Sequence, residues 1–277
     1  MNPSKDLFHK IQSRENQKLK LARSVRDGRE QEFIFVEGLR LCEEIAKTQL
    51  QIKTVFLTSE FLNKSSSERL VKELVAKKAE INEVDEKILD SLSDTKNSQG
   101  IIVIAEKPRT GREIVEKGLS ESSLLLLLHQ INNPSNLGAI LRTAEAVGVA
   151  GVIMTKGTTD VFSPKALRSA MGAAFRLRFW TNAVFFDVLR WAGEKRIKTV
   201  CAHIGSKKSY TEIDWNEPKL LIFGSEGHGL TDAEINNADE SLIISMENSV
   251  ESLNVAVACG VILFEAKRQK DLRKKGS

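Results

Sequence analysis

LLLLLHQINNPSNLGAILRTAEAVGVAGVIMT, residues 124–155, decides the architecture of the C-terminal half of the chain. It opens on an uninterrupted run of leucines, which is typical of a strand covered on both faces. A polar turn follows, and GVIMT (151–155) reads as the next strand. Between them, apolar residues recur at helical spacing at Ile140, Leu141, Ala144 and Val147. Strand, helix and strand in this order predict a parallel α/β sheet.

The same alternation extends outward from this stretch. Further strands are expected at 197–204, 220–224 and 241–246, with helices at 165–175 and from 252 into the basic tail. In the N-terminal half, strands at 33–38, 55–58 and 100–108 alternate with helices at 13–30 and 67–78, which predicts a small α/β sandwich. Residues 108–121 are polar and contain Pro and two Gly, so we expect a linker there between domains 1–107 and 122–277.

Composition narrows the class of protein. The chain has 277 residues and 41% hydrophobic content, and no apolar stretch approaches the ~18–20 residues that span a bilayer. MNPSKDLFHK (1–10) lacks the apolar core of a secretory signal, so we expect a cytoplasmic protein with no membrane contact. Cys42, Cys201 and Cys259 are scattered, and the four histidines show no ligand spacing. These residues predict reduced, buried thiols and no metal site.

Basic residues gather at both ends of the chain. The net charge is only +4, but residues 1–30 and 267–275 are rich in Lys and Arg. Such ends suit a polyanion, for example a nucleic acid. Taken alone, they are better explained as solubilising termini.

Three polar loops are expected at the carboxyl ends of strands, where parallel sheets bind their ligands: 132–138, 224–230 and 245–254. The second, GSEGHGL, has glycines in the order GxxGxG, which is neither the Rossmann nor the Walker pattern. It contains no lysine, and Glu226 would repel a phosphate. Its glycines permit positive φ angles and close approach of the backbone to a ligand. The loop therefore favours a cationic or hydrogen-bond-donating ligand, although a plain strand-to-helix turn is the simpler alternative.

The other two loops carry more polar groups than a turn needs. In the first, Asn136 or Ser135 is expected to cap the following helix, and Arg142 lies too far along the chain to stack on Asn136. In the third, Ser252 suits the cap of the last helix, whereas helix propensity explains Asn254 poorly. Together these residues indicate a binding or catalytic site.

The three loops resemble the motifs of a known family, the SpoU (TrmH-like) RNA ribose methyltransferases. Asn133-Pro-Ser-Asn136-Leu-Gly138 with Arg142-Thr143 resembles the first motif, GSEGHGL the second, and IISMENSVESLNVAVACGVILFE (243–265) the third. All three occur in the order of the family, over residues 122–270. SRENQKLK, FIFVEGLRL and NSQGIIVIAEKP in the N-terminal half resemble its accessory substrate-binding domain.

This resemblance implies an activity and a fold. The methyl donor would be S-adenosylmethionine, and the acceptor a ribose 2′-hydroxyl of RNA. The fold would be α/β, with a deep trefoil knot in the parallel-sheet methyltransferase domain and a smaller N-terminal α/β domain that binds RNA. The family forms homodimers with the site near the subunit interface. Many tRNA-modifying members lack a domain like 1–107, so ribosomal RNA is the favoured substrate. A tRNA 2′-O-methyltransferase and a non-catalytic RNA-binding protein are the alternatives.

The resemblance also assigns roles to individual residues. Backbone groups of Gly224, Ile244 and Leu253 would hold the adenosine of the cofactor, with Gly227 and Met246 beside them. The catalytic set would be Asn136, Arg142, Glu226, Ser252 and Asn254. Arg168 is expected to face RNA phosphate, and Lys18, Lys20 and Arg23 on the basic helix are expected to contribute to RNA binding.

One part of the third motif departs from the family, which usually has Ile-Pro-Met-x-Gly. Here Ser245 replaces the proline and Asn248 the glycine. Asn still tolerates the left-handed conformation, so we expect altered loop rigidity rather than lost activity. Either proton removal or stabilisation of negative charge would suit Arg142, and its high pKa favours the second role.

Overall fold

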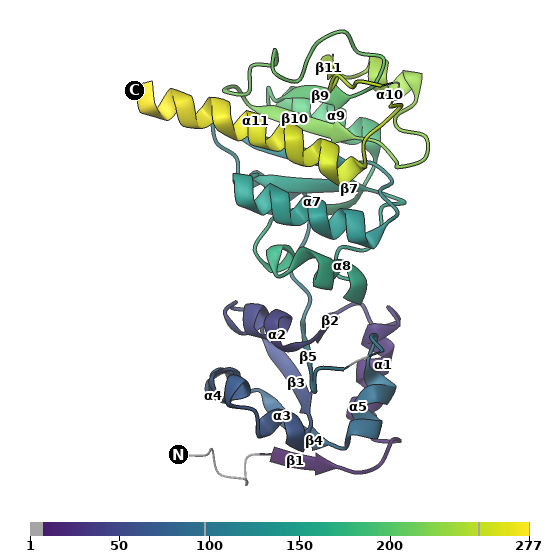
Figure 1. Cartoon of the computed structure of the whole chain (residues 1–277), viewed down its shortest axis with the longest axis vertical. Helices are drawn as coiled ribbons and strands as arrows, with labels where there is room; N and C mark the ends of the chain where they lie inside the picture. The colour runs from purple at the N-terminus through teal and green to yellow at the C-terminus, as the bar shows by residue number, and fades with distance from the viewer. Residues whose placement is uncertain (1–7, 97, 249, 277) are drawn as a thin grey trace. The chain divides into compact units, whose positions relative to one another are not determined.

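The computed structural model describes residues 8–96, 98–248 and 250–276. They form two compact units. The first comprises the described residues up to Pro108 together with Val161–Phe175, and the second comprises Arg109–Asp160 together with the described residues from Arg176 onward. Each unit has its own sheet (Figure 1).

The first unit is a five-stranded mixed sheet covered by helices. Its strand order is β1-β4-β3-β5-β2, and β5 runs in the opposite direction to the other four described strands. The strands are β1 (Phe8–Ile11), β2 (Phe33–Glu37), β3 (Ile52–Leu57), β4 (Glu80–Val84) and β5 (Ile101–Glu106). The helices are α1 (Gln17–Arg26), α2 (Leu39–Ala46), α3 (Ser59–Leu62), α4 (Glu68–Ala76) and α5 (Glu86–Leu92), with a 3-10 turn at Ser65–Ser67. Helix α1 packs with α5 and α2 with α4, so the predicted α/β sandwich is confirmed.

The second unit is a six-stranded sheet in the order β11-β9-β10-β6-β7-β8, and every pair in it is parallel. Its strands are β6 (Leu124–Leu128), β7 (Gly151–Thr155), β8 (Phe179–Ala183), β9 (Lys198–Ala202), β10 (Lys219–Phe223) and β11 (Glu240–Leu242). Its helices are α6 (Arg112–Glu116), α7 (Pro134–Val147), α9 (Phe185–Glu194), α10 (Asp232–Asn236) and α11 (Val255–Gly276). The predicted parallel α/β sheet is therefore confirmed, and the deep trefoil knot stays a prediction.

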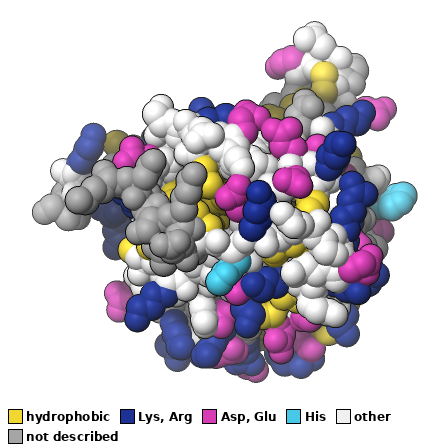
Figure 2. Space-filling view, turned by 90° about the horizontal axis from the view of Figure 1, so that it is seen from below, with side chains coloured by type: hydrophobic (Ala, Val, Ile, Leu, Met, Phe, Trp, Pro, Cys, Tyr) yellow, Lys and Arg dark blue, Asp and Glu magenta, His cyan; other side chains and the backbone are white. Residues whose placement is uncertain are grey.

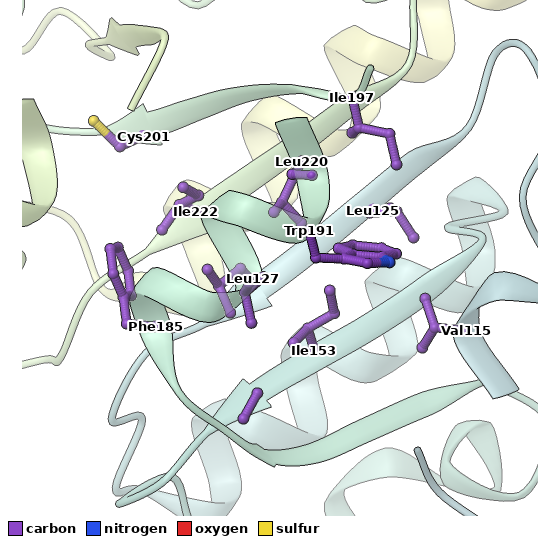
Figure 3. Close-up of a cluster of buried hydrophobic side chains, with 13 residues drawn as sticks. Val115, Leu125, Leu127, Ile153, Phe185, Trp191, Ile197, Cys201, Leu220 and Ile222 are labelled. Carbon is purple, nitrogen blue, oxygen red and sulfur yellow. The ribbon is translucent and has the colours of Figure 1, made fainter. Parts of the chain in front are cut away.

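The leucine run forms a central strand of this sheet. All five residues of β6 are buried between β10 and β7, as expected for a strand with both faces covered. Leu125 and Leu127 point into a cluster with Trp191 of α9 and Ile222 of β10 (Figure 3). Helices α7 and α11 pack side by side (Figure 1). Among the described residues, no helix is long and apolar enough to cross a membrane.

The domain division differs from the sequence prediction in two segments. Helix α6 lies inside the predicted linker 108–121, and it packs on β7 and β8 as part of the second unit. Residues 161–175 lie between β7 and β8 in the chain but group with the first unit. The cause is α8 (Pro164–Ala170), which packs against β2 and buries its apolar side chains.

Several predicted boundaries were wrong, each for a local reason. The helix expected at 165–175 ends at Ala170, because Met171 takes the left-handed conformation, and a 3-10 turn, Ala173–Phe175, follows. The strand expected at 241–246 ends at Leu242. Asn133, rather than Asn136 or Ser135, caps α7 by accepting a bond from the Ser135 amide. Likewise the Asn254 side chain, rather than Ser252, accepts from the first amides of α11.

Candidate active site

The three polar loops meet at the carboxyl edge of the second unit's sheet. They enclose a cavity of about 590 Å³. All five residues assigned to the cofactor line it: Gly224, Gly227, Ile244, Met246 and Leu253. Four of the five assigned to catalysis line it as well: Asn136, Glu226, Ser252 and Asn254. The structure thus gathers residues that lie more than a hundred positions apart in the chain.

The glycines of the second loop fold it back onto itself. Ser225 and Gly229 exchange two backbone hydrogen bonds, of 3.2 and 2.9 Å, and Gly229 has a φ of +66°. A Cβ placed on Gly224 would lie 2.3 Å from the carbonyl carbon of Gly229. No side chain fits at Gly224, because the opposing atoms are backbone. The loop therefore presents main-chain groups rather than side chains at the start of the cavity.

The Glu226 carboxylate fastens the second loop to the first. The amides of Asn132 and Asn133 donate to its two oxygens at 3.0 and 3.1 Å, and the Asn136 side-chain amide donates at 3.2 Å. These donors surround the start of α7, where the helix dipole also favours a negative charge. Glu226, the acidic residue of the glycine-rich loop, is thus held in place by three amide donors.

Asn136 extends this connection to the third loop. Its side-chain oxygen accepts a bond of 3.1 Å from the Asn254 amide, while the Asn254 oxygen caps α11. The sequence left Asn254 unexplained, and the structure gives it two roles: it starts the last helix and joins the third loop to the first. Glu226, Asn136 and Asn254 form one chain of hydrogen bonds across three loops.

The environment of Glu226 lowers its pKa. Partial desolvation raises the pKa, but the hydrogen bonds from Asn132, Asn136 and Asn133 outweigh it. The group is therefore a carboxylate at neutral pH, and its strongest acceptor sites are already engaged. A carboxylate with a depressed pKa and three donors is a poor proton acceptor, so its geometry suits positioning.

The backbone of the third loop takes the left-handed conformation at Asn248. This residue has a φ of +56°, the left-handed conformation that Asn tolerates and that the glycine of the family would also take. Ile244 and Met246 precede it and line the cavity. Ser252 and Leu253 are exposed at the cavity. The effect of Asn248 on loop rigidity and on activity stays a prediction.

Arg142 is the assigned residue that the structure does not bring into the cavity. It lies on α7, six residues after Asn136, and its side chain is exposed. Among the described residues, none forms a hydrogen bond or ion pair with the Arg142 guanidinium, and it does not line the cavity. The guanidinium is thus free to engage a group outside this single chain.

Sequence reasoning missed a fourth loop of the cavity. Ala202, the last residue of β9, and His203 and Ile204 after it form part of the lining. The signal was present, because a strand that ends in His-Ile-Gly at the same edge of a parallel sheet should face the ligand. The chain carried no motif at this position to draw attention to it.

The residues assigned to RNA binding in the first unit already have protein partners. Lys18 Nζ lies 2.6 Å from the Glu80 carboxylate, and Lys20 Nζ lies 3.0 Å from Glu15. Arg23 donates to the Arg14 carbonyl at 3.1 Å. On the face drawn in Figure 2, basic and acidic side chains are interspersed rather than segregated. Their contribution to RNA binding stays a prediction.

Arg168 is held within the first unit. One guanidinium nitrogen lies 2.7 Å from Asp94, and another lies 3.8 Å from the buried carboxylate of Glu37. These acids belong to β2 and the loop after α5, so Arg168 fastens α8 to the first unit. Contact of Arg168 with RNA phosphate also stays a prediction.

The cavity fits S-adenosylmethionine by size and by chemistry. Its volume lies within the ~300–1,000 Å³ typical of small-molecule sites. None of the described lining residues is Lys or Arg, so the lining offers no ammonium or guanidinium group to a phosphate. Main-chain groups around Gly224 and the apolar side chains of Ile244 and Met246 suit an adenosine, and acids nearby suit a sulfonium and an ammonium. Gly224, Ile244 and Leu253 would hold it.

Comparison with known proteins finds a matching family for each of the two units. Residues 123–264 match the SpoU rRNA Methylase family, and residues 35–111 match the RNA 2′-O ribose methyltransferase substrate-binding family. The chain is 28% identical over 259 residues to the 23S rRNA (guanosine(2553)-2′-O)-methyltransferase RlmP of Bacillus subtilis, covering 92% of this chain and 97% of that protein.

Two further similar proteins are also RNA methyltransferases by name. The chain is 33% identical over 187 residues to an uncharacterized tRNA/rRNA methyltransferase of Synechocystis, which covers 68% of this chain and 67% of that protein. A crystal structure of an AdoMet-bound rRNA methyltransferase from Sinorhizobium meliloti superimposes with a TM-score of 0.80 at 28% identity, covering 95% of this chain and 98% of that one.

Proposed function

Because the chain belongs to the SpoU rRNA methylase family, we propose that it transfers a methyl group from S-adenosylmethionine to a ribose 2′-hydroxyl of ribosomal RNA. The observation that carries this proposal is the cavity itself. Glycine-bounded main chain and apolar residues line one part, and the Glu226–Asn136–Asn254 chain lies beside it. Methyl transfer needs a pocket for the methyl donor beside groups that hold the acceptor in position, and this arrangement supplies both.

Bound there, the cofactor supplies an electrophilic methyl group on a positively charged sulfur. The transfer would release S-adenosylhomocysteine, and the proton of the ribose hydroxyl would pass to solvent. The protein must therefore align the ribose oxygen and stabilise its developing negative charge. Glu226 acts as a positioning residue, since it holds Asn136 and the start of α7 against the third loop.

Arg142 is the group suited to the developing alkoxide, and its position supports a site shared between two copies. Its guanidinium carries several N–H donors and could donate to both the ribose oxygen and an adjacent phosphate. The exposed face of α11 carries Val257, Val261 and Phe264 at helical spacing, with Phe264 54% exposed. An apolar stripe on a helix that packs against α7 suits a second copy of this chain. We therefore propose a homodimer in which Arg142 of one copy serves the cavity of the other.

Mixed dimers test this arrangement. One variant, Arg142→Ala, lacks the cation, and a second, Gly224→Val, lacks the cofactor pocket; each alone should transfer no methyl. When the two are unfolded, mixed and refolded together, a shared site predicts recovery of about one quarter of wild-type activity. Failure to recover, with heterodimers demonstrated by mass spectrometry, would place Arg142 in its own chain's site.

The substrate is proposed to be ribosomal RNA, and the protein cytoplasmic. The match of residues 35–111 to a substrate-binding family and the names of the relatives support ribosomal RNA over tRNA. Mapping 2′-O-methylated positions in RNA from cells with and without the protein tests it. One ribosomal position should lose its methyl group when the protein is absent. Loss at a tRNA position instead would favour the tRNA alternative.

A non-catalytic RNA-binding protein is the remaining alternative. It would need a cavity unable to hold the methyl donor. Titration calorimetry with S-adenosylmethionine separates the two, because a catalytic member must bind the cofactor and Gly224→Val must abolish that binding.

A further inference from the structure

An exposed phenylalanine lies outside everything the proposed function uses. Among the described residues, Phe186 and Phe264 are the strongly exposed phenylalanines, and Phe264 belongs to the apolar stripe on α11. Phe186 lies in the first turn of α9, 45% exposed, with Val184 exposed beside it. Neither residue lines the cofactor cavity.

The Phe186 ring rests on a rigid support. It packs edge-to-face on Phe185 with centroids 5.4 Å apart, and Phe185 packs in the same way on His129 at 4.9 Å. His129 is itself bonded on both ring nitrogens, to Thr155 and to Glu234, each at 3.0 Å. Phe185 is part of the buried cluster drawn in Figure 3. The exposed ring is therefore presented by an ordered stack rather than by a loose side chain.

This ring lies along the same edge of the sheet as the catalytic loops. Phe186 follows β8, and the loop after β7 bonds to both neighbours: Lys156 donates its amide to Ala183, and Thr159 to Ile131. Ile131 immediately precedes Asn132, whose amide binds Glu226. The loops after β8, β7, β6 and β10 thus form a continuous, hydrogen-bonded edge that runs from Phe186 to the catalytic cluster.

Two basic residues lie on the elements that meet at this edge. Lys156 is exposed directly after β7, and Arg190 lies one turn after Phe186 on α9. Arg190 pairs with Asp187 at 3.2 Å, but both side chains remain mostly exposed. Single-stranded RNA is commonly bound by exposed aromatic rings accompanied by basic side chains, because bases stack on the ring and phosphates pair with the cations.

We propose that Phe186, with Val184 two residues before it and Lys156 on the neighbouring loop, is a stacking platform for an unpaired base of the acceptor RNA. The occupant is a base next to, or part of, the methylated nucleotide, since the platform shares the edge that holds Glu226 and Asn136. Stacking there orients the RNA strand along the sheet edge and contributes to the choice of nucleotide. This inference rests on the proposed function, because it names how the same site grips its substrate.

Substitution of the ring tests the platform in the full-length protein. The probe is ribosomal RNA extracted from cells that lack the protein, with tritiated S-adenosylmethionine as donor. Phe186→Leu and Phe186→Ala should raise the KM for RNA by about 10-fold while leaving kcat and the Kd for S-adenosylmethionine unchanged. Phe186→Trp keeps an aromatic face and should stay close to wild type. The leucine variant separates the aromatic face from apolar bulk.

Three results would overturn the proposal. An unchanged KM for RNA in Phe186→Leu would rule out the stacking role. Methyl transfer by the wild-type protein in the same assay would leave the proposed function standing. Dissociation of a dimer by Phe186→Leu, seen by sedimentation, would make the ring an interface between copies. Absence of methyl transfer by the wild-type protein to this RNA would overturn the proposed function and the platform with it.

Discussion

Two carboxylates, one in each unit, are built in nearly the same way and do different things. Glu226 accepts from two backbone amides and an asparagine side chain, and Glu37 accepts from the Asp94 amide and from the Ser93 and Thr95 hydroxyls. Glu37 is only 4% exposed and lies near the Arg168 guanidinium, whereas Glu226 is exposed at a cavity. Three hydrogen-bond donors around a carboxylate therefore do not by themselves identify a functional acid. What distinguishes Glu226 from Glu37 is that Glu226 lies at a cavity.

The largest effect is expected at the buried acid. Glu37→Ala should lower the free energy of unfolding by about 3–5 kcal/mol, because it leaves buried donors without an acceptor and Arg168 with one fewer counter-charge. Denaturant unfolding measures this loss, and cofactor binding, which belongs to the second unit, should persist. Glu106→Ala is the matched control, since that acid lies on the same sheet but is exposed. Equal losses in both variants would contradict a structural role for Glu37.

The opposite pattern is expected at the exposed acid. Glu226→Ala should reduce methyl transfer about 100-fold, because the Asn136 amide and the start of α7 lose the group that positions them. Its unfolding midpoint should stay near that of wild type. Glu247→Ala removes an acid from the third loop outside the cavity and should leave transfer unchanged. A large loss of stability in Glu226→Ala would erase the distinction between the two acids.

Arg168, the cation near Glu37, provides a further test of the comparison between the two carboxylates. Arg168→Ala should cost about 1–2 kcal/mol of stability, since Glu37 keeps its three neutral donors. If this arginine only fastens α8, the slope of log Kd for RNA against log salt should be the same as in wild type. A slope reduced by about one unit would instead show that Arg168 contacts a phosphate, as the sequence predicted.

The smallest effect concerns pH. The pKa of Glu226 is lowered in the folded protein, so the carboxylate contributes stability that is present above its unfolded pKa and lost as pH falls through the folded value. The stability difference between wild type and Glu226→Gln should therefore be constant near neutral pH and shrink under acid conditions. Thermal unfolding over a pH series measures it. A difference that grows on acidification would contradict the direction of the shift.

The sequence predicted the parts of the fold that depend on local patterns. Runs such as Leu124–Leu128 and the glycine of the second loop were informative because burial and backbone conformation leave a direct trace in residue type. Helix caps were predicted less well, since Asn133, Ser135 and Asn136 all suit a cap and only the backbone path selects one. The place of 161–175 in the first unit depends on tertiary packing of α8 on β2 and leaves no local signal.

The residues of the site also divide into those with a local sequence signal and those without one. Residues within a motif were identified, and nine of the ten cofactor and catalytic residues line one cavity. Arg142 was grouped with them by its motif, yet the single chain leaves it outside the cavity. In the proposed homodimer, Arg142 would reach the cavity of the second copy. The loop after β9 and the Phe186 platform carry no motif, so only the sheet edge that they share with Glu226 reveals them.

The proposed function requires the loops at 224–230 and 245–254 to hold the methyl donor beside Asn136. A crystal structure of the protein grown with S-adenosylmethionine tests it most directly. The account predicts the adenosine against the main chain of Gly224, Ile244 and Leu253, with the methyl group facing the Asn136–Asn254 pair. A cofactor bound elsewhere, or a methyl group turned away from that pair, would contradict it.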